Sequence, residues 1–212
     1  PHPSRGPSGP SRQGATPDSP YRDEPSIANC PRPHKQPAAP PLLETVLGGR
    51  PAEWDAIKER MRDRLQAWAE IAKRADIVIA VKAHVSSAVN SPERLLWLLR
   101  EVESPQVCAA YDYSHFSLHG WKLEETLAPL LARTKFIHVK DAGGTLAKPQ
   151  FLLPGEGKID YVAYFGALAQ ANWSGPMVVE VSSQLFRQPG YDAIAAARKS
   201  FAALDAAARK AG

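Results

Sequence analysis

Four short apolar runs divide the chain, and longer amphipathic stretches separate them. The runs predict β-strands covered on both faces, because they lack the alternation of a half-exposed strand. They lie at 76–84, 107–116, 136–141 and 177–183. Elsewhere apolar residues recur every three or four positions, which predicts amphipathic helices. These are expected at 51–74, 91–99, 123–131, 160–168 and 192–210. Strands that alternate with helices predict an α/β protein with a parallel sheet.

The first 41 residues differ from the rest of the chain. They contain 12 of the 20 prolines and almost no large apolar residue. Such a composition cannot bury enough surface to offset the entropy lost on ordering, so 1–41 is predicted to be disordered. The folded domain is predicted to span 42–212. Its first piece, LLETVLGG at 42–49, is short, and we do not count it among the strands.

Charge and cysteine usage narrow the class of partner. The net charge is +4, but acidic and basic residues are interspersed and form no basic stripe, so no nucleic-acid partner is expected. No apolar run approaches the roughly 20 residues that a membrane helix needs, so no membrane partner is expected either. Cys30 and Cys108 lie far apart, which suggests neither a disulfide framework nor a zinc site. This usage predicts a reducing, cytoplasmic location.

Ionisable residues stand at the carboxyl end of every predicted strand. In α/β proteins these ends meet at one edge of the sheet, where active sites form. One such coincidence carries little weight, but four in register predict a shared site. The residues are Lys82 and His84, Asp112 and His115, His138 and Asp141, and Glu180.

Several motifs together resemble the sugar phosphate isomerase/epimerase family. They are YDYSHF (111–116), FIHVKD (136–141), LPGEGKIDY (153–161) and MVVEVS (177–182), with VKAH (81–84) as a weaker match. These proteins are xylose isomerase-like TIM barrels, grouped with the AP endonuclease 2 superfamily. The resemblance covers residue 42 to the end. It implies a partial (β/α)8 barrel with roughly strands 4–8 present, because a full barrel needs eight strand–helix units.

The family implies a divalent metal (Mn, Mg or Zn) held by Glu, Asp, His and Glu at strand ends. By position, Asp112, His138 and Glu180 match three of these ligands, and Lys82 stands at the first. A protonated lysine cannot donate a lone pair to a metal. Lys82 could be ion-paired in a site that has lost its metal. It could instead act as an electrophile or base, or form a Schiff base with a carbonyl substrate.

The other polar residues near the strand ends have two readings each. His84 and His115 are expected to hydrogen-bond sugar hydroxyls or carboxylates behind the metal ligands, or else to be core histidines with backbone partners. Lys140 is expected to face away from His138 on its strand, and is a substrate-binding candidate or part of a structural ion pair. Glu156, between two glycines, could bind sugar hydroxyls or cap the next helix. Asp141 is expected to orient a metal ligand from behind.

A half-barrel would expose sheet edges and apolar helix faces. A short fifth strand is expected near 153–159, and the first three strands of the barrel are missing. The chain is therefore expected to be N-terminally truncated, or to be completed by a homo-oligomer or a complementing chain.

Three functions remain open. The first is an isomerase or epimerase that acts on a small keto-sugar, polyol or sugar phosphate through the metal and an enediolate. Glu180 would be its base, and Lys82 its acid or electrostatic partner. The second is a non-catalytic sugar-binding remnant, and the third is a metal-dependent AP endonuclease-like hydrolase.

Overall fold

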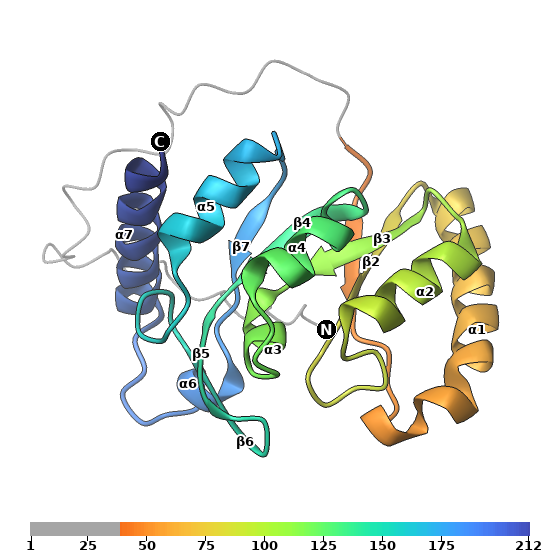
Figure 1. The fold of residues 1–212 in the computed structure, drawn as a ribbon, viewed down its shortest axis with the longest axis horizontal. Coiled ribbons are helices and arrows are strands. Elements are labelled where there is room, and N and C mark those ends of the chain that lie inside the picture. The colour runs from red at the N-terminus through yellow and green to blue at the C-terminus, as the bar shows by residue number, and fades with distance from the viewer. Residues whose placement is uncertain (1–38) are drawn as a thin grey trace, which may run out of the picture. The chain divides into compact units, whose positions relative to one another are not determined.

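A computed structural model describes residues 39–212. Its centre is a parallel sheet of five strands in the order β1-β2-β3-β4-β7, shown in Figure 1. The strands are β1 (Leu42–Thr45), β2 (Val78–Lys82), β3 (Val107–Tyr111), β4 (Thr134–Val139) and β7 (Met177–Val179). The α/β class and the parallel sheet are therefore confirmed. Residues 1–38, most of the segment predicted to be disordered, lie outside the described residues.

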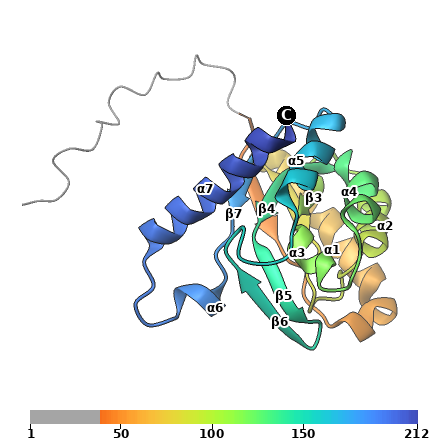
Figure 2. The same ribbon diagram turned by 60° about the vertical axis from the view of Figure 1, so that its left-hand side comes forward.

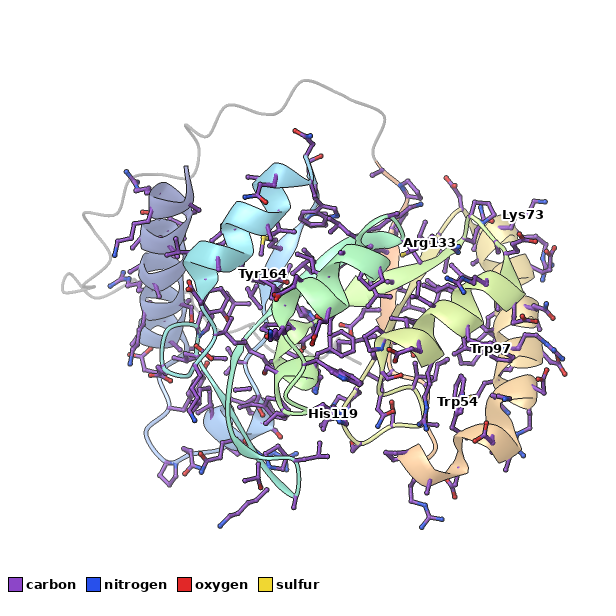
Figure 3. All side chains as sticks on the ribbon, viewed as in Figure 1. Trp54, Lys73, Trp97, His119, Arg133 and Tyr164 are labelled. Atoms are coloured by element: carbon purple, nitrogen blue, oxygen red, sulfur yellow. The ribbon has the colours of Figure 1, made fainter. Side chains whose placement is uncertain are left out.

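Helices connect the strands. A 3-10 turn at Pro51–Glu53 leads into α1 (Trp54–Ala75), and α2 (Pro92–Val102) follows β2. The later helices are α3 (Tyr113–Ser117), α4 (Leu123–Leu131), α5 (Tyr161–Gln170), α6 (Ser183–Phe186) and α7 (Ala193–Ala211). Side-chain caps start several of them; Ser91 Oγ, for example, accepts a hydrogen bond of 3.3 Å from the N–H of Arg94. Trp54 and Trp97 meet edge to face between α1 and α2, with ring centroids 5.5 Å apart (Figure 3).

The two faces of the sheet bury different clusters. Ile79 and Val81 point to the large core that the helices cover. The opposite face carries a second, small apolar cluster made of even-numbered strand residues, because side chains alternate along a strand. Its members are Val78, Ala80, Cys108 and Ala110, with Leu42 and Phe136 against them. The ionisable residues continue these even-numbered rows.

Three local expectations were wrong. Residues 42–45 form the strand β1, which pairs in parallel with β2. No strand covers 153–159; instead β5 (Asp141–Thr145) and β6 (Lys148–Leu152) form an antiparallel hairpin just before it. Strand β5 needs glycine at Gly144, where φ is +75° and an added Cβ would collide with the carbonyl of Lys148.

The third difference is the end of β3, which stops at Tyr111 rather than continuing to 116. The Asp112 side chain accepts a hydrogen bond from the N–H of Ser114 and so caps the short helix α3. His115 therefore lies on a helix and not on a strand.

The outer strands β1 and β7 each pair on one side only within residues 39–212. Leu43 of β1 is 55% exposed, and Ile71 of α1 is 53% exposed. The five parallel strands make a half-barrel with an apolar margin, as the resemblance implied. No helix among the described residues is long and apolar enough to cross a membrane.

Candidate active site

Six ionisable side chains gather at the carboxyl ends of the parallel strands. They come from all five strands or from the residues that directly follow them, and all have even numbers, which places them on the face of the small apolar cluster. We call this group the strand-end cluster: Glu44, Lys82, Asp112, His138, Lys140 and Glu180.

Lys82 stands at the centre of the cluster. Its Nζ lies 2.8 Å from Glu180 Oε2, 3.0 Å from Glu44 Oε1 and 3.1 Å from His138 Nδ1. Asp112 Oδ2 is 4.0 Å away. Burial alone would lower the pKa of Lys82, but the neighbouring carboxylates outweigh it and raise the pKa above its ordinary value. Lys82 is therefore an ammonium, which disfavours a Schiff base because that reaction needs the neutral amine.

Lys140 brings a second buried ammonium to the same carboxylates. Its Nζ lies 2.7 Å from Glu180 Oε2 and 2.8 Å from Asp112 Oδ2. The ring of Phe151, on β6, covers this ammonium with its centroid 4.8 Å from Nζ. The hairpin that carries Phe151 lies beside α3 and α6 in both views (Figures 1 and 2). Gln184 of α6 holds it there by accepting a hydrogen bond of 2.8 Å from the N–H of Phe151.

The two ammonium groups keep the buried acids ionised. Burial would raise the pKa of Glu180, but hydrogen bonds from His138, Lys140 and Lys82 hold it well below its usual range. Burial would also raise the pKa of Asp112, yet His115, Lys140 and Lys82 lower it overall. The cluster is thus a set of charged groups that compensate one another in a buried place.

His84 and His115 stack beside the cluster, with ring centroids 4.1 Å apart. Nδ1 of His115 accepts a hydrogen bond of 3.4 Å from the N–H of Val85, and its Nε2 lies 3.2 Å from Lys140 Nζ and 3.4 Å from Asp112 Oδ2. Burial lowers the pKa of His115 to about 3. Burial, helped by Lys140 and Lys82, also lowers the pKa of His84, whose Nδ1 bonds Ser86.

We expect acidification to destabilise the fold through these histidines. In the unfolded chain the imidazole of His115 binds a proton near pH 6.5, whereas in the folded protein it does so only near pH 3. Protons therefore favour the unfolded chain, and stability is lost as the pH falls below 6.5. Asp112 and Glu180, whose pKa values are lowered, add to this loss only below about pH 4. The free energy of unfolding should be about 2 kcal/mol smaller at pH 5 than at pH 7. Urea unfolding of the protein and of His115→Gln measures this; equal pH dependence in both would contradict it.

Asp112, His138 and Glu180 offer a metal-binding geometry, since one ligand atom from each lies within 4.8 Å of the others. The oxygens that a metal would need are already hydrogen-bonded to ammonium groups, however. Three carboxylates face two ammonium groups here, so a divalent ion would reverse the sign of the net charge. With both lysines in these positions, the donor set does not fit a divalent metal.

The structure does not bring Asp141 and Glu156 into the cluster. Asp141 is buried, and its carboxylate accepts hydrogen bonds of 3.0–3.1 Å from the N–H groups of Ala142, Gly155 and Ile159. It fixes the loop 153–159 and contacts no candidate metal ligand in any described interaction. Glu156 pairs with Lys199 of α7 and accepts from the N–H of Leu153.

Gly157 should be intolerant of a side chain because of Asp141. A Cβ at this glycine would lie 2.6 Å from Asp141 Cγ and 2.8 Å from the carbonyl oxygen of Ala142. Gly157→Ala should therefore lower the free energy of unfolding by about 1–3 kcal/mol. The control is Gly166→Ala in α5, where nothing lies within 4 Å and alanine should stabilise the helix by about 0.5–1 kcal/mol. Equal effects in thermal unfolding would contradict this role of Asp141.

Two residues of the site escaped the sequence reasoning. Glu44 contacts both Lys82 and His138, the latter at 3.2 Å from Nδ1. The sequence pattern that could have revealed Glu44 is two apolar residues followed by an acid, with glycines a few residues later. Phe151 reaches Lys140 through the hairpin, and no pattern in the sequence points to that contact.

Comparison with known proteins agrees with the half-barrel fold. Residues 36–207 match the family described as xylose isomerase-like TIM barrel. An inosose dehydratase of Geobacillus kaustophilus is 23% identical over 162 residues, which cover 69% of this chain and 51% of the relative. An L-ribulose-5-phosphate 3-epimerase of Escherichia coli O157:H7 is 27% identical over 133 residues, which cover 62% and 46%. The chain thus spans about half the length of the curated relatives it matches.

One solved structure with the same fold is that of the IOLI protein with a bound zinc atom. It superposes with a TM-score of 0.65 and 23% identity, over 78% of this chain and 63% of that one.

Proposed function

The chain belongs to the xylose isomerase-like TIM barrel family, and from this premise we propose that its strand-end cluster isomerises or epimerises a small keto-sugar, polyol or sugar phosphate. The reaction would pass through an enediolate, formed when a proton leaves the carbon next to a carbonyl group. An epimerase and a dehydratase among the matched relatives support sugar-like substrates.

The observation that carries the proposal is that two buried ammonium groups share one carboxylate oxygen. Lys82 and Lys140 both donate to Glu180 Oε2, at 2.8 and 2.7 Å. Preorganised donors in a buried site stabilise the charge that develops on a carbonyl oxygen when the neighbouring carbon loses a proton. A carbonyl oxygen that bonds to these ammonium groups would lie next to a carboxylate.

Glu180 is the proposed base, and it would become basic only after the substrate binds. With three donors on it, the carboxylate has a pKa far below neutral and is a weak base. A substrate carbonyl that takes over the hydrogen bonds of Lys82 and Lys140 would remove two of these donors and raise the basicity of Glu180. Binding and base activation would then be coupled. His84, which is only half-buried, is proposed to bind a sugar hydroxyl, and His115 to hold Asp112 from behind.

Asp112, His138 and Glu180 are the residues that would hold the divalent metal implied by the family. Because the donor set does not fit it while both lysines hold their bonds, no step is assigned to a metal.

Exchange of carbon-bound hydrogen with solvent tests the proposal. Small keto-sugars and their phosphates are incubated with the protein in D2O, and deuterium next to the carbonyl is followed by NMR. We expect incorporation with at least one of them, whether or not a new isomer accumulates. Saturable binding without incorporation would contradict the proposal and favour a non-catalytic sugar-binding module, which the low basicity of Glu180 also suits.

A further inference from the structure

We propose that the ammonium of Lys82 is the resident cation of the strand-end cluster, in the place where a divalent metal would bridge Asp112, His138 and Glu180. Lys82 contacts or approaches all three carboxylates of the cluster and the imidazole of His138. Its Nζ lies within 3.1 Å of Glu180, Glu44 and His138, and 4.0 Å from Asp112 Oδ2. The three candidate ligand atoms lie within 4.8 Å of one another. Lys82 Nζ contacts or approaches all three residues, so the ammonium occupies the space that a metal would need.

The charges around Lys82 nearly cancel without a metal, with one carboxylate in excess of the ammonium groups. Glu44, Asp112 and Glu180 provide three carboxylates, and Lys82 and Lys140 provide two ammonium groups. A divalent ion among them would stand a few ångströms from two like charges, in a buried region where such repulsion is large. Metal binding would therefore require Lys82 to leave.

Glu44 supports this assignment from the edge of the sheet. It lies on β1, and its two oxygens contact Lys82 Nζ at 3.0 Å and His138 Nδ1 at 3.2 Å. A buried lysine needs a counter-ion. Glu44, on β1, supplies one that is not among the three candidate metal ligands. Without the Lys82 charge, Glu44, Asp112, Glu180 and His138 would become three carboxylates and an imidazole, a donor set that suits divalent metals.

Zinc titration of the full chain tests the proposal. The purified protein, the variant Lys82→Met and the control Lys73→Met are each dialysed against Zn²⁺ and analysed for bound zinc. Methionine keeps the length of the side chain and removes its charge, and Lys73 is an exposed lysine on α1 (Figure 3). We expect no zinc at the cluster in the protein or in Lys73→Met. We expect one zinc per chain in Lys82→Met, bound at least about 100-fold more tightly.

His138→Gln, in the wild-type and in the Lys82→Met background, identifies where any zinc binds. Zinc that survives this change lies elsewhere and is subtracted. Stoichiometric zinc on the unaltered protein that is lost in His138→Gln would overturn the proposal, and so would a folded Lys82→Met chain that takes up none. If Lys82→Met does not fold without metal, refolding on zinc addition supports the proposal. If zinc does not refold it, the zinc titration of the unaltered protein decides. Lys82 would hold this place whether or not the chain turns over a sugar, so a failed sugar assay leaves the result intact.

Discussion

Replacing Asp112 with Ala is expected to lower the free energy of unfolding by about 3–5 kcal/mol, because it removes one of the two carboxylates that pair with the buried ammonium of Lys140. Asp112 is fully buried and lies 2.8 Å from Lys140 Nζ, with Lys82 at 4.0 Å. The same change removes the cap of α3, where Oδ1 accepts from the N–H of Ser114 at 3.1 Å. Urea unfolding followed by circular dichroism measures the loss.

Asp160→Ala separates the buried charge from the helix cap. Asp160 caps α5 by accepting from two backbone N–H groups, at 2.9 and 3.0 Å, but no ion pair involves it among the described residues. Losing a cap alone should cost about 1 kcal/mol. If Asp112→Ala costs no more than Asp160→Ala, the buried ion pairs contribute nothing that the cap does not.

Replacing Glu180 with Gln is expected to slow deuterium incorporation into substrate by about 100-fold or more, the usual contribution of a general base. Glutamine keeps the shape and one acceptor oxygen for Lys82 and Lys140, so the fold should persist. The measurement is the rate of exchange at saturating substrate, beside a thermal unfolding curve.

Glu156→Gln is the matched control for the base. Glu156 pairs with Lys199 on α7 and lies outside the strand-end cluster, so this variant should exchange at the rate of the unaltered protein. Unchanged exchange in Glu180→Gln, or an equal loss in Glu156→Gln, would remove Glu180 from the role of base.

Periodicity predicted much of the fold because it is local. The runs that became β2, β3, β4 and β7 are apolar over several residues and stand between amphipathic helices. The rule that strand ends converge also brought Asp112, His138 and Glu180 to one edge, and the structure places their ligand atoms within 4.8 Å. Lys140 was expected to face away from His138, and this was wrong: residues two apart on a strand share a face, and both side chains contact Glu180 Oε2.

What local patterns did not predict depends on tertiary pairing. β1 has only four residues and is a strand because it pairs with β2, 36 positions along the chain from Leu42 to Val78. Glu44 was missed with it. The sequence analysis did not predict the hairpin β5–β6, so it missed the contact between Phe151 and Lys140. His115 was placed on a strand because the capping role of Asp112 was not considered.

Lysine ammonium groups, rather than a metal ion, are the cations of the strand-end cluster. The effect of a chelator on the exchange of substrate hydrogen with solvent tests this most directly. Deuterium incorporation is measured on the chain after EDTA treatment, and again after Mn²⁺ or Zn²⁺ is added back. With Lys82 and Lys140 as the cations of the site, the exchange rate should be the same before and after the chelator. Exchange that disappears with EDTA and returns with Mn²⁺ or Zn²⁺ would contradict this account and restore the metal to Asp112, His138 and Glu180.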